Sequence, residues 1–330
     1  MSRKLKLALP LLALGLLLPV SAMAAVVNPC NNILASHVYV NSFSGLINYP
    51  QYFAGLGAPV PTGSGLEPNA GGGTLTFTSG SAFTYKETLA IANMGLYQDV
   101  VIQGTYTLSP DTSTGACTGS MSGAGNLRGL TLPFTYKLIA SNDTYRVELM
   151  NTNTGLLIGF NGEGLTPGPA VTCSNASLNS TGYSYSYDAS GWTIAPANTP
   201  STQMFGGYIP LVITGSILFT PAPAAGTIAG APSSSDLISA SDTVSINGRI
   251  ASRTVTGWYV VNANCTGTMV LQSPGYANMT FEIFPSFQNL TVRAVDIDPQ
   301  VTLPGNVNTP PVIIGAKFTR SDASVPMSSN

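Results

Sequence analysis

The sequence contains two diverged copies of one module, and this internal repeat limits the fold more than any other feature does. Each copy has a cysteine, an alternating stretch, a tyrosine-containing stretch and a Cys-Thr-Gly segment, in the same order. The first copy places them at Cys30, 37–40, 104–108 and 117–121, and the second at Cys173, 183–187, 257–261 and 265–269. Because the order and spacing of four features agree, the chain is predicted to fold as two similar units.

The downstream parts of the two copies also correspond. Segment 134–138 matches 281–284, segment 145–149 matches 290–294, and segment 157–160 matches 313–316. The second copy has an additional Pro-rich segment at 299–311, and a Gly/Pro-rich stretch at 164–169 suits a linker. The predicted organisation is therefore a signal peptide at 1–24, a first β module at 25–166 and a second at 167–330.

The pattern within each module is alternation of apolar and polar residues, which is typical of strands and not of helices. In the second copy the expected strands are 182–189, 208–220, 241–248, 254–263, 266–273, 278–284, 288–296 and 311–319. Turn clusters such as Asn247-Gly248 and Ser273-Pro-Gly275 separate them. About eight strands with short connections predict an all-β chain of two antiparallel meander barrels, since closure removes exposed edges. Two β-sandwiches are the alternative architecture.

The Tyr-x-Val/Leu and Cys-Thr-Gly-Ser/Thr strand pair, together with the closing Ile-Gly strand, resembles a group of uncharacterised exported bacterial β proteins. Those proteins are similar in strand pattern to calycin-type or allene-oxide-cyclase-like eight-stranded barrels. The resemblance covers most of each module and implies a barrel fold and a bacterial origin. It implies no activity and no functional residue.

The N-terminus has the pattern of a secretory signal peptide. Arg3, Lys4 and Lys6 form a basic region, an apolar stretch follows at 7–20, and Ala22-Met-Ala24 supplies a small-x-small cleavage site. We expect cleavage after Ala24 and a periplasmic or extracellular protein. No later apolar stretch is long enough for a transmembrane helix.

The four cysteines are predicted to form disulfides, because an even number in an exported chain is typical of an oxidising compartment. Three pairings are possible. If the two copies share a fold, the pairs Cys30–Cys117 and Cys173–Cys265 occupy equivalent positions, and this pairing is the expected one. The spacing lacks the close cysteine pairs of a zinc site.

The sequence offers little for catalysis. His37 is the only histidine and no serine lies in a nucleophile elbow, so a serine triad is not expected. Asp296-Ile-Asp298 could begin a calcium loop, although a turn is the better interpretation. The glycine runs at 71–73 and 123–125 are expected to form hairpin turns. The remaining carboxylates are scattered, with the candidates Glu87, Asp99, Glu148, Glu163, Asp188, Glu282, Asp296 and Asp298.

These observations favour a non-enzymatic exported binding protein or envelope-associated structural protein without catalytic residues, metal or cofactor. Charged residues make up 8% and the net charge is −2, so nucleic acid is not an expected partner. The expected partners are a protein, a glycan or a small hydrophobic ligand. Tyr183, Tyr185 and Tyr187 share one sheet face, which serves either packing or a ligand.

The second hypothesis is a carrier or isomerase that holds a small hydrophobic ligand in a barrel cavity. A cavity lined by aromatic side chains with one or two inward polar groups would favour it. Solid barrels with an exposed apolar patch would favour the first hypothesis. An outer-membrane barrel is a weaker third option, because the strands look short for a span.

Overall fold

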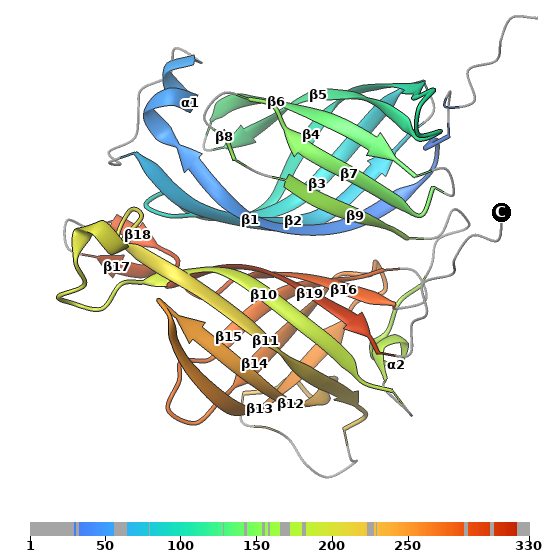
Figure 1. Ribbon diagram of the computed structural model, residues 1–330. Helices are drawn as coiled ribbons and strands as arrows, with labels where there is room; N and C mark the ends of the chain where they lie inside the picture. The colour runs from blue at the N-terminus through green and yellow to red at the C-terminus, as the bar shows by residue number, and fades with distance from the viewer. Residues whose placement is uncertain are drawn as a thin grey trace, which may run out of the picture.

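The computed structural model describes residues 30, 33–55, 65–78, 80–127, 129–141, 144–153, 156–157, 159–165, 172–179, 183–222, 228, 230–286, 290–303 and 307–321. It confirms an all-β fold of two barrel-like modules, so the sandwich alternative is wrong (Figure 1). The predicted signal peptide at 1–24 lies outside the described residues, as does most of the predicted linker.

Module 1 is an antiparallel meander that returns to its first strand. Each strand from β1 to β7 pairs with the next, β7 pairs with β9, and β9 pairs with β1; β8 also pairs with β1. The elements are β1 Val38–Asn48, α1 Tyr49–Gly55, β2 Leu66–Phe77, β3 Ala82–Ile91, β4 Gly95–Pro110, β5 Cys117–Leu127, β6 Leu130–Ala140, β7 Arg146–Asn151, β8 Leu156–Leu157 and β9 Gly159–Leu165.

Module 2 is a closed barrel in the order β10-β11-β12-β13-β14-β15-β16-β19. The Pro-rich insertion contributes a separate hairpin, β17–β18, before the last barrel strand. The elements are α2 Asn175–Leu178, β10 Tyr185–Ile194, the 3-10 helix η1 Ser201–Gln203, β11 Tyr208–Thr220, β12 Asp236–Ile246, β13 Arg249–Val261, β14 Gly267–Gln272, β15 Met279–Pro285, β16 Thr291–Asp296, β17 Val301–Leu303, β18 Val307–Thr309 and β19 Val312–Arg320.

The turn expected at Asn247-Gly248 is present between β12 and β13, with φ angles of 48° and 81°. Positive φ at both positions is what a two-residue hairpin turn requires, and Asn-Gly accommodates it best. The turns expected at the glycine runs are wrong: 71–73 lies inside β2 and 123–125 inside β5. At Gly71 a Cβ atom would lie 2.5 Å from Cζ of Phe43, so this glycine makes room for a ring on the neighbouring strand.

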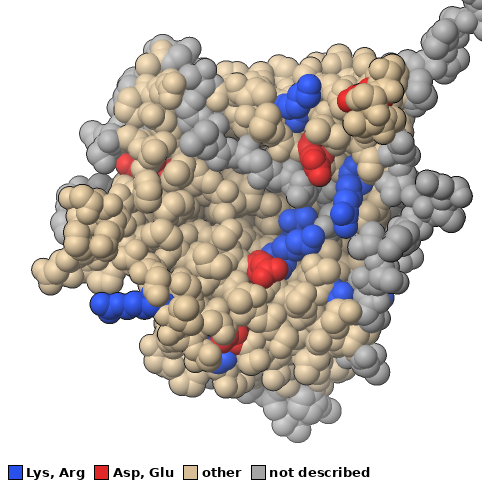
Figure 2. All heavy atoms as spheres, in the orientation of Figure 1, with Lys and Arg blue, Asp and Glu red and all other residues tan. Residues whose placement is uncertain are grey.

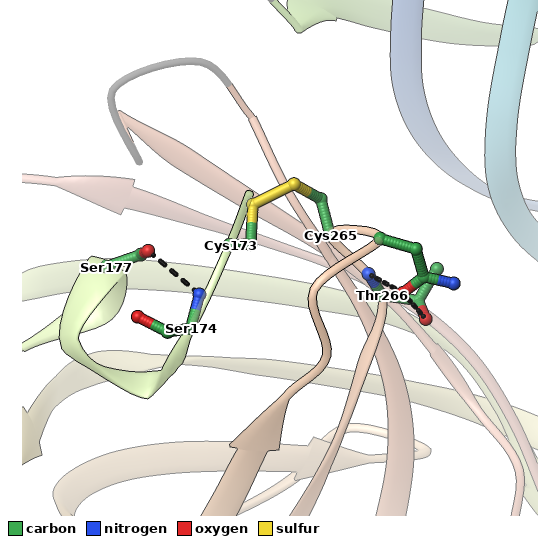
Figure 3. Close-up of a disulfide and its surroundings, with 6 residues drawn as sticks. Cys173, Ser174, Ser177, Cys265 and Thr266 are labelled. Carbon is green, nitrogen blue, oxygen red and sulfur yellow. Dashed lines mark hydrogen bonds between the residues drawn. A yellow bond between two sulfur atoms is a disulfide. The ribbon is translucent and has the colours of Figure 1, made fainter. Parts of the chain in front are cut away.

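The predicted disulfides, Cys30–Cys117 and Cys173–Cys265, are confirmed, with Cα–Cα distances of 5.5 and 5.0 Å. In module 2 the bridge joins the segment that leads into α2 to the turn before β14 (Figure 3). The backbone N–H of Ser174 donates to Oγ of Ser177 at 3.1 Å and so closes the first turn of the short helix. The bridges therefore fix the N-terminal segment of each barrel to its middle, at the first residue of β5 in module 1 and at the turn before β14 in module 2.

The two modules pack side by side through β1 and β2 of the first and β16 and β19 of the second (Figure 1). A separate apolar cluster lies between them, composed of Val40, Ala70, Ala90, Ala92, Tyr208, Phe284, Val295 and Ile313. Polar contacts border it: Oγ of Ser42 donates to the Ala316 carbonyl at 2.8 Å, and Oγ1 of Thr88 donates to Glu282 at 2.5 Å. Few charged side chains appear on the face seen in Figure 2, in agreement with the low charge of the sequence.

Strand pairing also defines which residues of the two modules are equivalent. Tyr136 lies opposite Met121 on β5, and Phe281 lies opposite Met269 on β14. Because both methionines follow a Cys-Thr-Gly segment, Tyr136 is equivalent to Phe281. The sequence match of segment 134–138 to 281–284 is therefore wrong by two residues.

Candidate functional site

Both barrels carry a carboxyl group at the same interior position. In module 1, Glu87 on β3 lies opposite Val100 on β4. In module 2, Asp242 on β12 lies opposite Arg253 on β13. Both acids are at most 4% exposed. The equivalent acids thus face different cross-strand partners, an apolar one in module 1 and a cation in module 2.

A glycine on the preceding strand accompanies each acid. Gly73 lies opposite Glu87, and Gly215 lies opposite Asp242. A Cβ atom at Gly73 would lie 2.0 Å from the carbonyl oxygen of Lys86, and one at Gly215 would lie 2.7 Å from Cβ of Asp242. No side chain fits at either position, so both copies use glycine to let the acid-bearing strand approach closely.

The acid of module 2 is fully paired. Nε and Nη2 of Arg253 donate to the two Asp242 carboxylate oxygens at 2.8 and 2.6 Å, and the Tyr187 hydroxyl donates to Oδ2. The guanidinium also lies 5.0 Å from the centre of the Tyr276 ring. A bidentate buried ion pair with a third donor satisfies the carboxylate within the protein.

Among the described residues, no such cation pairs with the acid of module 1. Burial raises the pKa of Glu87 to about 8, and a hydrogen bond with Tyr85 opposes this shift. The Tyr85 hydroxyl also donates to Oδ1 of Asn41 at 2.7 Å. Burial raises the pKa values of the nearby phenols Tyr52 and Tyr136, and the charge of Glu87 raises them further. The carboxyl group is therefore mostly protonated at pH 7.

A cavity of about 30 Å³ lies beside Glu87. Its walls are mostly apolar and aromatic, and they also carry the carboxyl group of Glu87 and the amide group of Asn69. The lining residues are Phe43, Ile47, Tyr52, Asn69, Glu87, Leu89, Ile91, Met94, Leu127, Leu132, Phe134 and Tyr136. Asn69 is 1% exposed, and its Oδ1 has no hydrogen-bond partner in the protein. The volume suits about one or two water molecules, or the polar head of a larger molecule.

Helix α1 lies at one end of module 1 (Figure 1), and its residue Tyr52 lines the cavity. Along β3, Ile91 is nearest the covered end, Leu89 follows, and Glu87 is deeper in the barrel. The Tyr52 hydroxyl of α1 donates to the Pro133 carbonyl on β6 at 3.1 Å, which ties the helix to the barrel rim. Apolar side chains and one helix thus separate Glu87 from solvent at this end.

A second concave site lies at one end of module 2, with a volume of about 540 Å³. The loop before β11 and the β12–β13 hairpin form its walls, and Nδ2 of Asn247 donates to Oε1 of Gln203 at 2.9 Å across them. Ile250 is 74% exposed at this site, and among the described residues that line it Arg249 is the one charged residue. The groove is apolar, half-open and of a size typical of ligand sites.

Tyr185 and Tyr187 lie within the packed core of module 2, and half-buried Tyr183 packs against this core. Tyr185 contacts Phe219, and Tyr187 stacks on Phe318 with 5.2 Å between ring centroids. These contacts show that the three rings take part in the packing of module 2.

His37 is held by local hydrogen bonds. Its Nε2 lies 3.1 Å from Oγ1 of Thr144, and its Nδ1 lies 3.1 Å from the Ala35 carbonyl. Asp296 and Asp298 form a turn, because the backbone N–H of Asp298 donates to Oδ1 of Asp296 at 3.1 Å. Among the described residues, no group of three or more His, Cys, Asp or Glu side chains could hold a metal ion.

Glu87 was predicted only as one of the scattered carboxylates, and its interior position was not predicted. The signal is present in the alternation, since Phe83, Tyr85, Glu87 and Leu89 occupy every second position of one strand. A charged residue within an inward apolar series indicates a buried group. The same signal identifies Asp242 and Arg253.

Comparison of the chain with protein-family models, curated proteins and solved structures finds no significant match. In the part of the chain that the structure describes, no helix is long and apolar enough to cross a membrane. The function is therefore inferred from the side chains and cavities of the two barrels.

Proposed function

We propose that the chain is a non-enzymatic exported binding protein in which module 1 holds a small organic molecule and module 2 is a filled scaffold. The observation that carries the proposal is the buried carboxyl group of Glu87, which borders a cavity and pairs with no cation among the described residues, whereas its equivalent in module 2 is fully paired. Aromatic walls with two inward polar groups are the features expected of a ligand site.

Binding accounts for this cavity better than catalysis does. Among the described side chains that line it, Glu87 is the one carboxyl group, and there is no histidine, cysteine or serine. Acid–base or nucleophilic chemistry needs a second group within hydrogen-bonding reach of the reacting atoms. The phenols of Tyr52 and Tyr136 also line the cavity, but burial raises their pKa values, so neither serves as a base at pH 7.

The proposal includes export through the predicted signal peptide. The two disulfides are compatible with an oxidising compartment. We expect the protein isolated from the cell envelope or the medium to begin at Ala25, within a few residues. Intact-mass measurement checks this, and recovery of a chain that begins at Met1 would contradict it.

Cavity filling tests the binding function. Leu89→Phe adds roughly the volume of the cavity, so it should weaken binding of a small aromatic probe such as benzyl alcohol at least tenfold. The methyl group of Met94, which lines the cavity, reports binding by methionine-methyl NMR. Ile139→Phe, at an exposed position of β6, is the matched control and should bind as the unmodified protein does. Equal binding by both variants would contradict the proposed location.

The groove of module 2 supports a second candidate function, the binding of an apolar partner. Its volume of about 540 Å³ and the exposure of Ile250 favour this function. An anilinonaphthalene sulfonate probe combines apolar rings with an anion that Arg249 can face. We expect Ile250→Ser to reduce its fluorescence enhancement, whereas Val212→Ser, at an exposed position outside the groove, should leave it unchanged. Equal enhancement by both variants would exclude the groove.

A further inference from the structure

We infer that the cavity of module 1 is an amine site, in which the ammonium group of a small organic amine pairs with Glu87. The inference rests on the proposed binding function and names the ligand class. In module 2 the equivalent acid is paired by the guanidinium of Arg253. In module 1 the position of that arginine is Val100, and none of the described residues that line the cavity is a cation, so we assign the cation to the ligand.

Two side chains that line the cavity, Glu87 and Asn69, offer acceptor oxygens. Glu87 accepts when ionised, and Oδ1 of Asn69 is buried without a partner in the protein. An ammonium group carries only donors, three in a primary amine, and so complements both. A carboxylate or phosphate ligand would instead meet an acid, with no arginine or lysine among the described residues that line the cavity.

The aromatic walls add to this selectivity. Phe43, Tyr52, Phe134 and Tyr136 line the same cavity, and the face of an aromatic ring attracts a cation. The pKa values of Tyr52 and Tyr136 are raised by burial, so both phenols stay neutral at pH 7. A positive charge in the cavity therefore meets one titrating group, Glu87, with Tyr85 beside it.

Binding of the amine displaces a proton. Below pH 8 the Glu87 carboxyl group is mostly protonated, and the incoming ammonium stabilises its carboxylate form. One proton is then released to solvent for each ammonium bound, and no covalent bond to carbon changes. Above pH 8 the carboxylate is already formed, so the same ligand binds without releasing a proton.

The size of the cavity restricts the ligand. A volume of about 30 Å³ admits the head of a primary amine, and the body has to extend past Leu89 toward Met94 and helix α1. Movement of Met94 or Tyr52 would provide that space. A linear alkylamine fits this path, whereas a quaternary ammonium lacks the N–H groups that Asn69 needs.

Calorimetric titration of the full chain with propylamine and with the neutral isostere 1-propanol tests the inference. We expect propylamine to bind at least tenfold more tightly than 1-propanol at pH 9. At pH 6.5 its affinity should be about 30-fold lower, since about 3% of Glu87 is ionised there. Titration in two buffers of different ionisation enthalpy should show about one proton released at pH 6.5 and almost none at pH 9.

Matched variants complete the test. Glu87→Gln should abolish the preference for the amine and the proton release, whereas Glu148→Gln, an exposed acid of the same module, should change neither. Equal binding of 1-propanol and propylamine would overturn the amine assignment and leave the binding function standing. Absence of binding by both compounds would overturn both. Amine binding that survives in Glu87→Gln would also overturn the assignment.

Discussion

The two barrels share one chain path and differ in how they treat the same interior acid. Module 2 surrounds Asp242 with Arg253 and Tyr187 and fills the remaining space with aromatic rings. Module 1 leaves Glu87 opposite Val100 and keeps a cavity beside it. The fold therefore tolerates two states of a buried carboxyl group, a paired carboxylate and a protonated acid. The first adds specificity to the core, and the second leaves a group that can respond to a ligand.

The two modules also differ in which of two paired strands carries the larger core side chain. In module 1, Phe43 on β1 lies opposite Gly71 on β2. At the equivalent place in module 2, Ala189 on β10 lies opposite Ile213 on β11. A large residue thus faces a small one in both copies, on opposite strands. Repacking of this kind maintains a barrel interior as the two copies differ, whereas Val100, at the position of Arg253, offers no cation to Glu87.

The largest effect is expected from breaking the ion pair of module 2. Arg253→Met should destabilise the protein by about 3–5 kcal/mol at pH 7, because Asp242 stays buried without its cation. Val100→Met, at the equivalent position of module 1, should cost at most about 1–3 kcal/mol by overpacking. Urea denaturation of both variants measures the difference. Equal costs would show that the two acids are not in different states.

Removal of the disulfides should affect the modules equally. The bridges close loops of 87 and 92 residues, so the double substitutions Cys30→Ser/Cys117→Ser and Cys173→Ser/Cys265→Ser should each cost about 2–4 kcal/mol. Parallel urea denaturation of the two variants checks this. A large inequality would mean that one bridge has a role beyond loop closure.

Much of the fold could be predicted because it depends on local patterns. The expected strand at 208–220 is β11, and the Asn247-Gly248 turn is where the alternation breaks. The disulfides followed from the repeat, since equivalent cysteines occupy equivalent places. The turns predicted at the two glycine runs were wrong, because a glycine can relieve a cross-strand clash as well as form a turn. The side chains of the partner strand decide between these two roles.

The candidate site could be predicted in part. Alternation alone places Glu87 inside a barrel, but its partner depends on the register of β3 against β4. That register shifts between Glu87 and Leu89, an irregularity that no sequence pattern indicates. The cavity depends on the summed volumes of twelve side chains from distant segments. That Val100 and not a cation lies opposite Glu87 could therefore not be predicted from the sequence.

Glu87→Gln should remove a pH dependence of the free energy of unfolding that arises from module 1. The pKa of Glu87 in the folded protein, about 8, lies above the 4.5 of an unperturbed glutamate, so the folded state retains a proton that the unfolded chain releases. The stabilising contribution is complete below about pH 4.5 and is lost as the pH rises to about 8. Relative to Glu87→Gln, the unmodified protein should lose about 2–3 kcal/mol between pH 5 and pH 7.

Urea denaturation at the two pH values measures this difference. Glu148→Gln serves as the control and should follow the unmodified protein at both. A constant difference between the unmodified protein and Glu87→Gln from pH 5 to pH 7 would show that Glu87 is ionised throughout, and module 1 would then resemble module 2.

Val100→Arg should have the smallest net effect on stability, and it tests the equivalence of the two acids directly. The new guanidinium can pair with Glu87 as Arg253 pairs with Asp242. Arginine is larger than valine by more than the volume of the cavity, so overpacking costs about 1–3 kcal/mol. We expect these terms to offset each other to within about 1 kcal/mol at pH 7. The decisive change is in pH dependence: with a cation beside it, the pKa of Glu87 should fall below the ordinary value, so stability becomes flat between pH 5 and pH 7. Val100→Met adds length without charge and should retain the slope of the unmodified protein. If Val100→Arg retained that slope as well, the guanidinium would not reach Glu87, and the position that Arg253 fills in module 2 would have no functional counterpart in module 1.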